Sequence, residues 1–312
     1  MLIVFVIMLR LGICLLLVVC TRALNEELEH HEHPEGDETY SFDREVFLGS
    51  RAVANQLLTM SIDEGTDKFL SIAQKMDSNG DGMISKEELS TALEQNFLLL
   101  DREEATEKLH EWDTNKDGFV DWTEYIYGVY QTDVAKFEEL LKGDNKDPAA
   151  KATVKTYVSD KFRYSLADKD QDNRLNIEEL TAFLHPYDFE HMLPAEIRQT
   201  RESYDINEDG VISLDEFIRS DATGSTSEWR QVEEDRFKNE LDKNKDGVLD
   251  DNELRQWIAP SLSSAASDES LHLISIIDSD GDGLLSQSEL SDAYPVLMGA
   301  EPFDFEESHD EL

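Results

Sequence analysis

The sequence predicts an all-α protein built from six helix–loop–helix units, and three observations carry this prediction. First, an acidic loop of twelve residues recurs six times along the 312-residue chain. Second, successive loops begin 36, 55, 37, 37 and 36 residues apart, a step that suits one helix–loop–helix unit directly followed by the next. Third, apolar residues recur at three- and four-residue steps between loops, as Phe69, Ile72, Ala73 and Met76 do before the first.

Five of the loops share one ligand pattern, D-x-[DN]-x-[DN]-G-x5-E. They are DSNGDGMISKEE (77–88), DTNKDGFVDWTE (113–124), DINEDGVISLDE (205–216), DKNKDGVLDDNE (242–253) and DSDGDGLLSQSE (278–289). This is the EF-hand calcium loop. Calcium takes six to eight oxygen ligands, so short Asp or Asn side chains suit positions 1, 3 and 5, and a bidentate Glu suits position 12. Glycine at position 6 allows the sharp turn of the backbone.

The sixth loop, DKDQDNRLNIEE (168–179), departs from the pattern only at position 6, where Asn173 replaces glycine. Asn is the non-glycine residue best suited to a left-handed backbone. Arg174 at position 7 can offer its carbonyl whatever its side chain does. We therefore expect a sixth working loop. The alternative is a loop without metal that is kept for pairing with another loop.

The predicted metal ligands are the residues at positions 1, 3, 5, 7, 9 and 12 of each loop, for up to six Ca²⁺ ions, with no catalytic residue and no organic cofactor. In chain order they are Asp77, Asn79, Asp81, Met83, Ser85, Glu88, Asp113, Asn115, Asp117, Phe119, Asp121, Glu124, Asp168, Asp170, Asp172, Arg174, Asn176, Glu179, Asp205, Asn207, Asp209, Val211, Ser213, Glu216, Asp242, Asn244, Asp246, Val248, Asp250, Glu253, Asp278, Asp280, Asp282, Leu284, Ser286 and Glu289.

The apolar residue at position 8 of each loop is expected to join two loops through a short β-bridge of two residues. We expect three pairs, the first loop with the second, the third with the fourth and the fifth with the sixth. The predicted boundaries are a signal peptide (1–23), an acidic and largely mobile segment (24–62), pair 1–2 (63–135), a linker helix with pair 3–4 (136–225), pair 5–6 (226–300) and an acidic tail (301–312). Spacing alone leaves the boundary between the last two pairs open.

The charge of the chain limits its partners. Lys and Arg number 28 against 70 Asp and Glu, a formal net charge of −42. This excess disfavours nucleic acid and anionic membrane surfaces as partners and suits the binding of cations. With 39% hydrophobic residues, the chain has enough apolar material for a core, so wholesale disorder is not expected.

The two ends of the chain resemble targeting signals of the secretory pathway. The first twenty residues, MLIVFVIMLRLGICLLLVVC, suit a signal peptide, with a signal anchor as the alternative. Cleavage is expected after Ala23 or after Cys20, and no stable membrane insertion is expected afterwards. Both cysteines lie in this segment, so the mature chain is expected to form no disulfide. His309, Asp310, Glu311 and Leu312 form an HDEL retention signal, which predicts the lumen of the endoplasmic reticulum and its retention receptor as a partner.

Six EF-hand loops between a signal segment and HDEL resemble the reticulocalbin and calumenin (CREC) family, and closest of all an ER-retained reticulocalbin. The stretches EELTAFLHPYDFEHM (178–192), DWTEYIYGVY (121–130) and EDRFKNELDKNKDGVLDDNEL (234–254) are also similar to the family. The resemblance implies low-affinity calcium binding in the secretory pathway and chaperone-like contacts with cargo.

Three functions are compatible with this sequence. A protein that buffers or senses luminal calcium, and compacts on binding it, is favoured. A calcium-dependent chaperone or adaptor for secretory clients is the alternative. An enzyme with regulatory EF-hands is disfavoured, because the sequence contains no P-loop, H-E-x-x-H or G-x-S-x-G motif.

Overall fold

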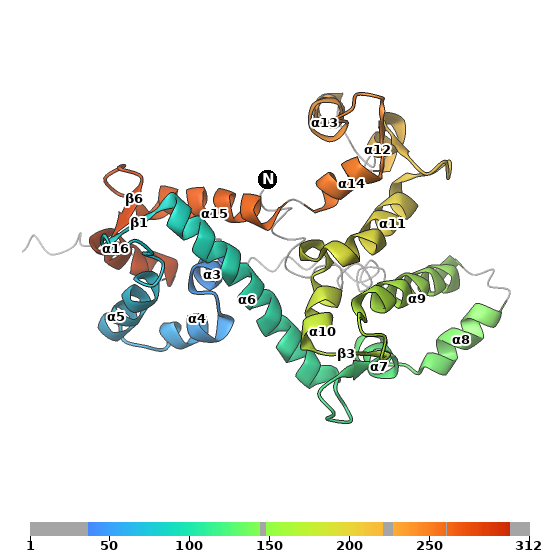
Figure 1. The fold of residues 1–312 in the computed structure, drawn as a ribbon, viewed down its shortest axis with the longest axis horizontal. Helices are drawn as coiled ribbons and strands as arrows, with labels where there is room; N and C mark the ends of the chain where they lie inside the picture. The colour runs from blue at the N-terminus through green and yellow to red at the C-terminus, as the bar shows by residue number, and fades with distance from the viewer. Residues whose placement is uncertain (1–36, 144–147, 221–226, 260, 300–312) are drawn as a thin grey trace, which may run out of the picture. The chain divides into compact units, whose positions relative to one another are not determined.

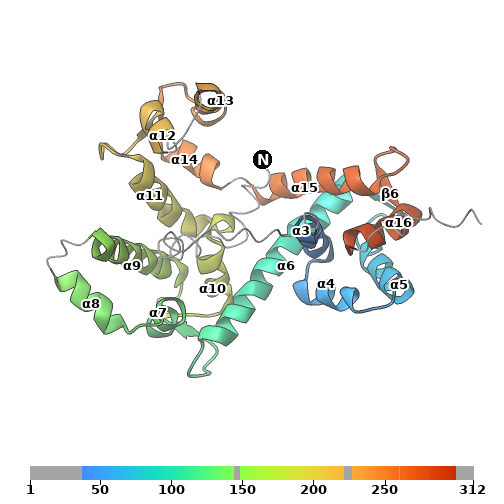
Figure 2. The same cartoon turned by 180° about the vertical axis from the view of Figure 1, so that it is seen from behind.

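The computed structural model describes residues 37–143, 148–220, 227–259 and 261–299, and these fall into two compact units (Figure 1 and Figure 2). The terminal unit combines residues 37–103 with residues 261–299, so it is built from both ends of the described chain. The central unit contains the described residues from 104 to 259. Helices dominate both units and the strands are very short, so the predicted all-α class is confirmed.

The terminal unit holds the first and the sixth loop around one core. Val46, Phe69, Leu93 and Leu285 are among its fully buried side chains. Its elements are α3 (Asp37–Leu48), α4 (Arg51–Leu58), α5 (Ile62–Ala73), β1 (Met83–Ser85), the first part of α6 (Lys86–Trp112), α15 (Leu262–Ile277), β6 (Leu284–Ser286) and α16 (Gln287–Leu297).

The central unit holds the other four loops around two clusters of buried side chains. One cluster surrounds the second and third loops, and the other surrounds the fourth and fifth. Its elements after α6 are β2 (Val120–Asp121), α7 (Trp122–Tyr130), α8 (Val134–Lys142), α9 (Pro148–Ala167), β3 (Arg174–Leu175), α10 (Ile177–Leu184), the 3-10 turns η2 (Pro186–Asp188) and η3 (Glu190–Met192), α11 (Leu193–Tyr204), β4 (Ile212–Ser213), α12 (Leu214–Ser220), α13 (Ser227–Arg236), the π-helical turn η4 (Phe237–Leu241), β5 (Val248–Leu249) and α14 (Asp251–Ile258).

The strands join the loops in an order that corrects the expected pairing. The three antiparallel pairs are β1 with β6, β2 with β3, and β4 with β5, so loop 1 pairs with loop 6, loop 2 with loop 3, and loop 4 with loop 5. The reason lies in α6, a single helix of 27 residues that starts within loop 1 and ends where loop 2 begins. At 1.5 Å per residue it spans about 40 Å, so loops 1 and 2 cannot exchange strand hydrogen bonds.

The 55-residue step from the start of loop 2 to the start of loop 3 lies within one pair of loops and does not separate two pairs. The added residues form α8, which folds back along the start of α9, and the rings of Phe137 and Tyr157 stack with centroids 4.8 Å apart. Farther along α9, the Tyr164 hydroxyl donates hydrogen bonds to the carbonyls of Val120 (2.9 Å) and Asn173 (3.1 Å). One side chain thereby ties loop 2 to loop 3.

Part of the segment expected to be mobile, residues 24–62, is structured. Residues 37–62 contain α3 and α4, and Val46 and Phe47 are completely buried. The ring of Phe47 stacks on Phe69 with a centroid distance of 4.8 Å. The sequence pattern did not reveal α3, because its apolar face packs against α16, about 250 residues later in the chain.

The expected signal peptide and the tail with HDEL lie outside the described residues. Across the ranges that are described, no helix has both the length and the apolar character needed to cross a bilayer.

Candidate metal centres in the six loops

Position 12 of every loop points both oxygens of its carboxylate back into the loop. One oxygen accepts a hydrogen bond from the backbone N–H of position 9 at 2.8 to 3.1 Å, and the other accepts one from position 3 at 3.1 to 3.4 Å. These glutamates are Glu88, Glu124, Glu179, Glu216, Glu253 and Glu289. Each sits in the first turn of the helix that leaves its loop, so the helix fixes its direction.

In loops 1 and 6 the hydrogen bonds at position 12 also lower the pKa of the carboxylate. The N–H and hydroxyl of Ser85 lower the pKa of Glu88 to about 2, and Ser286 does the same for Glu289. Both glutamates are therefore ionised at any physiological pH. A permanently charged, oriented carboxylate is the ligand that distinguishes a calcium loop from an acidic turn.

The first half of each loop turns its side-chain oxygens toward the same interior. The position-1 Asp accepts a hydrogen bond from the position-6 N–H at 2.9 Å in all six loops. The residues at positions 3 and 5 each accept from the backbone N–H two residues later. Ligand atoms of three carboxylates come within 4.8 Å of one another in loop 3 (Asp168, Asp170 and Glu179) and in loop 6 (Asp278, Asp280 and Asp282), and no such group of three forms among the described carboxylates of the other four loops.

Asn173 adopts the backbone conformation that was expected of it. Its φ is +66°, against +81° to +89° for the glycines at position 6 of the other five loops. Its N–H donates to Asp168 at the same 2.9 Å as those glycines do. The side-chain oxygens of Asp168, Asp170 and Glu179 lie within 4.8 Å of one another, a spacing that a single metal ion can bridge. The turn of loop 3 is therefore built like the others.

The side chain of Arg174 makes contacts that were not predicted from the sequence. Its guanidinium lies 3.0 Å from Asp172 in its own loop and 3.5 Å from Asp117 in loop 2, and it covers the ring of Phe119 at 4.2 Å. Both aspartates occupy position 5 of their loops, a predicted ligand position. The only signal in the sequence was a cation at position 7, and its meaning depends on loop 2 being the partner. This fixed positive charge opposes a calcium ion in either loop.

Position 8 behaves as expected in every loop, because its side chain is at most 3% exposed. The pairs are Ile84 with Leu285, Val120 with Leu175, and Ile212 with Leu249. Each pair joins its two loops directly through the strand register.

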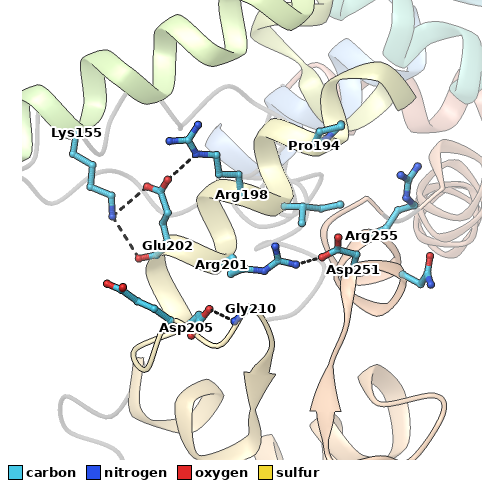
Figure 3. Close-up of a pocket in the computed structure, with 12 residues that line it drawn as sticks. Lys155, Pro194, Arg198, Arg201, Glu202, Asp205, Gly210, Asp251 and Arg255 are labelled. Atoms are coloured by element: carbon cyan, nitrogen blue, oxygen red, sulfur yellow. Dashed lines mark hydrogen bonds and ion pairs between the residues drawn. The ribbon is translucent and has the colours of Figure 1, made fainter.

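A pocket of about 630 Å³ lies beside loop 4 (Figure 3). Asp205 and Gly210 of that loop line it, and basic side chains from α9, α11 and α14 surround it. These cations are already engaged: Lys155 and Arg198 pair with Glu202, Arg201 pairs with Asp251, and Arg255 pairs with Glu190. The pocket is thus close to neutral despite its arginines.

Comparison with known proteins identifies relatives over nearly the whole chain. The family model of the EF-hand domain pair matches residues 74–130 and 159–220, and an EF-hand model matches residues 239–259. The chain is 33% identical over 300 residues to Reticulocalbin-2 of Mus musculus, covering 95% of this chain and 93% of the relative. It is 33% identical over 274 residues to Reticulocalbin-2 of Crotalus adamanteus, covering 86% and 89%. Reticulocalbin-3 of Rattus norvegicus is 32% identical over 298 residues, covering 91% and 88%.

Proposed function

The chain belongs to the reticulocalbin family and carries EF-hand domains, and from this premise we propose that it buffers or senses calcium in the lumen of the endoplasmic reticulum. The observation that supports the proposal best is that all six loops, the Asn173 loop included, hold the side-chain oxygens of positions 1, 3, 5 and 12 with nearly the same hydrogen bonds from the backbone. Each loop is proposed to bind one Ca²⁺. The signal segment and HDEL support the luminal location.

The distribution of charge supports a response of the fold to calcium. Of the 70 acidic residues, 22 occupy ligand positions in the loops, and six Ca²⁺ ions would add 12 positive charges. Without that compensation the carboxylates repel one another within each loop. We propose that the protein compacts when calcium is bound and loosens when calcium is withdrawn.

The affinity of the sites decides whether this response operates in the cell. At free calcium equal to Kd, each site adds about 0.4 kcal/mol of stability, or roughly 2.4 kcal/mol for six. At a hundredfold excess each adds about 2.7 kcal/mol, or roughly 16 kcal/mol in total. Because net stabilities are about 5–15 kcal/mol, only weak sites allow compaction to follow the calcium level.

Calorimetric titration of calcium into the chain, at physiological salt with magnesium present, tests the proposal. We expect about six sites with Kd values from high micromolar to near millimolar. Binding at or below micromolar concentrations would refute a role in sensing, because the sites would then always be filled. A count of five would identify the Asn173 loop as silent, and Asn173→Gly should then restore the sixth site.

A matched pair of variants tests whether loop 3 gives rise to one of the calcium-binding heats. Glu179→Gln removes the position-12 ligand of loop 3 and should abolish one site. Glu178→Gln removes the same charge from the neighbouring exposed residue and should leave six. Equal behaviour of the two variants would show that total charge, and not the loop geometry, controls the binding.

A calcium-dependent adaptor for secretory clients is the second candidate, and the pocket beside loop 4 favours it. Asp205 lines the pocket and is also the position-1 ligand of that loop, so calcium binding would alter the pocket wall. Binding of a reduced, carboxymethylated secretory protein should then require calcium. The same affinity with and without calcium would leave the calcium buffer as the better description. In neither role is the chain proposed to be an enzyme.

A further inference from the structure

Three metal-ligating side chains gather in the terminal unit, away from the six loops. They are Asp43 on α3, and Glu269 and His272, which lie three residues apart on α15. One ligand atom from each side chain lies within 4.8 Å of the other two. The Nε2 atom of His272 is 3.3 Å from an Oδ atom of Asp43.

The two carboxylates are buried, and the His272 imidazole beside Asp43 leaves one oxygen of Glu269 unpaired. Asp43 and Glu269 are each 3% exposed, and the Oε1 atom of Glu269 has no hydrogen-bond partner among the described residues. Burial and the neighbouring charge of Asp43 raise the pKa of Glu269 to about 7. Carboxylates are almost never this deeply buried unless a cation or a hydrogen-bond donor accompanies them. The cluster therefore holds two buried carboxylates against a single imidazole.

The spacing of the ligand atoms suits a small transition-metal ion. Zinc binds His nitrogen and carboxylate oxygen at about 2.0–2.2 Å, and two ligands of a tetrahedral site then lie about 3.4 Å apart. The observed 3.3 Å between Asp43 and His272 matches that edge, and it is long for a hydrogen bond between charged groups, for which about 2.7–2.9 Å is usual.

The chemistry of the donors separates this cluster from the calcium loops. Calcium prefers an all-oxygen shell of six to eight ligands, whereas imidazole suits Zn²⁺ and its neighbours in the transition series. The His272 side chain is 41% exposed, so an ion can enter from solvent and keep a water as its fourth ligand. A divalent ion would also balance the two buried negative charges.

We propose that Asp43, Glu269 and His272 form a binding site for a divalent transition metal, with Zn²⁺ as the best fit. The site takes ligands from α3 and from α15, so a bound ion would hold together two helices from opposite ends of the described chain. Bound zinc would hold α3 on the terminal unit independently of the calcium in loops 1 and 6.

The test is a calorimetric titration of Zn²⁺ into the full chain with calcium at saturation, so that the loops are filled. We expect one zinc site per chain. His272→Gln and Glu269→Gln should weaken it by at least about tenfold, since even partners of direct ligands change metal affinity 10–100-fold. The matched control is Asp268→Asn, which removes a charge from an exposed residue of the same helix and should leave zinc binding unchanged.

A second measurement guards against misfolded variants. His272 is partly exposed, so His272→Gln should retain the calcium heats and the helical circular dichroism of the parent. Zinc should then raise the melting temperature of the parent chain and not that of His272→Gln. The absence of a zinc site in the parent, or zinc binding that all three variants retain equally, would overturn the proposal. Those outcomes would not affect the calcium function, which is measured separately.

Discussion

The pairing of loop 1 with loop 6 makes a sharp prediction about Leu285. This residue is fully buried at position 8 of loop 6 and lies opposite Ile84 of loop 1 in the strand register. Leu285→Ala removes its buried methyl groups and leaves a cavity, which costs about 2–5 kcal/mol in a well-packed core. We take about 3 kcal/mol as the expected loss, and it should fall on the terminal unit alone.

Amide hydrogen exchange at saturating calcium measures this loss for each unit separately. Because 1.4 kcal/mol corresponds to a factor of ten, about 3 kcal/mol accelerates exchange roughly a hundredfold where exchange requires opening of the unit. We expect this acceleration around Phe69 in α5 and Leu290 in α16. Exchange around Tyr164 in α9 and Leu180 in α10, in the central unit, should not change.

The matched control is Leu175→Ala in loop 3, which removes the same side chain from the fully buried partner of Val120. It should reverse the pattern, loosening α9 and α10 while α5 and α16 keep their protection. The reasoning fails if Leu285→Ala leaves α5 protected. It also fails if that variant loosens α14 next to loop 5, as pairing of loops 5 and 6, neighbours in sequence, would require.

Four further changes test other contacts. Arg174→Gln should raise the calcium affinity of loops 2 and 3 only, by severalfold, because the variant lacks the positive charge beside the position-5 carboxylates of these two loops. A residue-resolved titration measures this effect. Asp160→Ala should cost about 2–5 kcal/mol in denaturant unfolding, since the hydroxyls of the buried Tyr125 and the half-buried Tyr130 lose their acceptor. Phe47→Ala should cost about 3–5 kcal/mol, whereas a mobile segment would show no effect. Glu269→Gln should stabilise the zinc-free chain by up to about 3 kcal/mol at pH 7.5 and by nothing near pH 4.5.

The sign of the last effect follows from the direction of the pKa shift. Glu269 has its pKa raised from 4.5 to about 7 in the folded chain, so the fold binds a proton that the unfolded chain releases. The stability that the protonated Glu269 gives to the fold is fully present below pH 4.5 and is lost as the pH rises toward 7. Unfolding curves of both chains, taken with a zinc-selective chelator, measure the difference. A constant difference between pH 4.5 and 7.5 would contradict it.

The sequence by itself determined the chemistry of the loops. All six loops and a predicted set of ligand positions could be read from the residue pattern, because an EF-hand loop is a local structure whose twelve residues contain both the donors and the turn. The left-handed turn at Asn173 was predictable for the same reason. Position 8 could also be assigned to the core, since its apolar side chain follows from the register within one loop.

Only the tertiary structure decided which loops are partners and which distant side chains meet. Loop 1 finds loop 6 because α6 is continuous, and a helix cannot bend back to pair its own two ends. The helix α3 looked mobile because its apolar face is covered by residues from the other end of the chain. Arg174 with Asp117, and Asp43 with His272, become neighbours through the same long-range packing. Contacts of this kind are set by how helices bury their apolar faces, and no local pattern records which face will cover which.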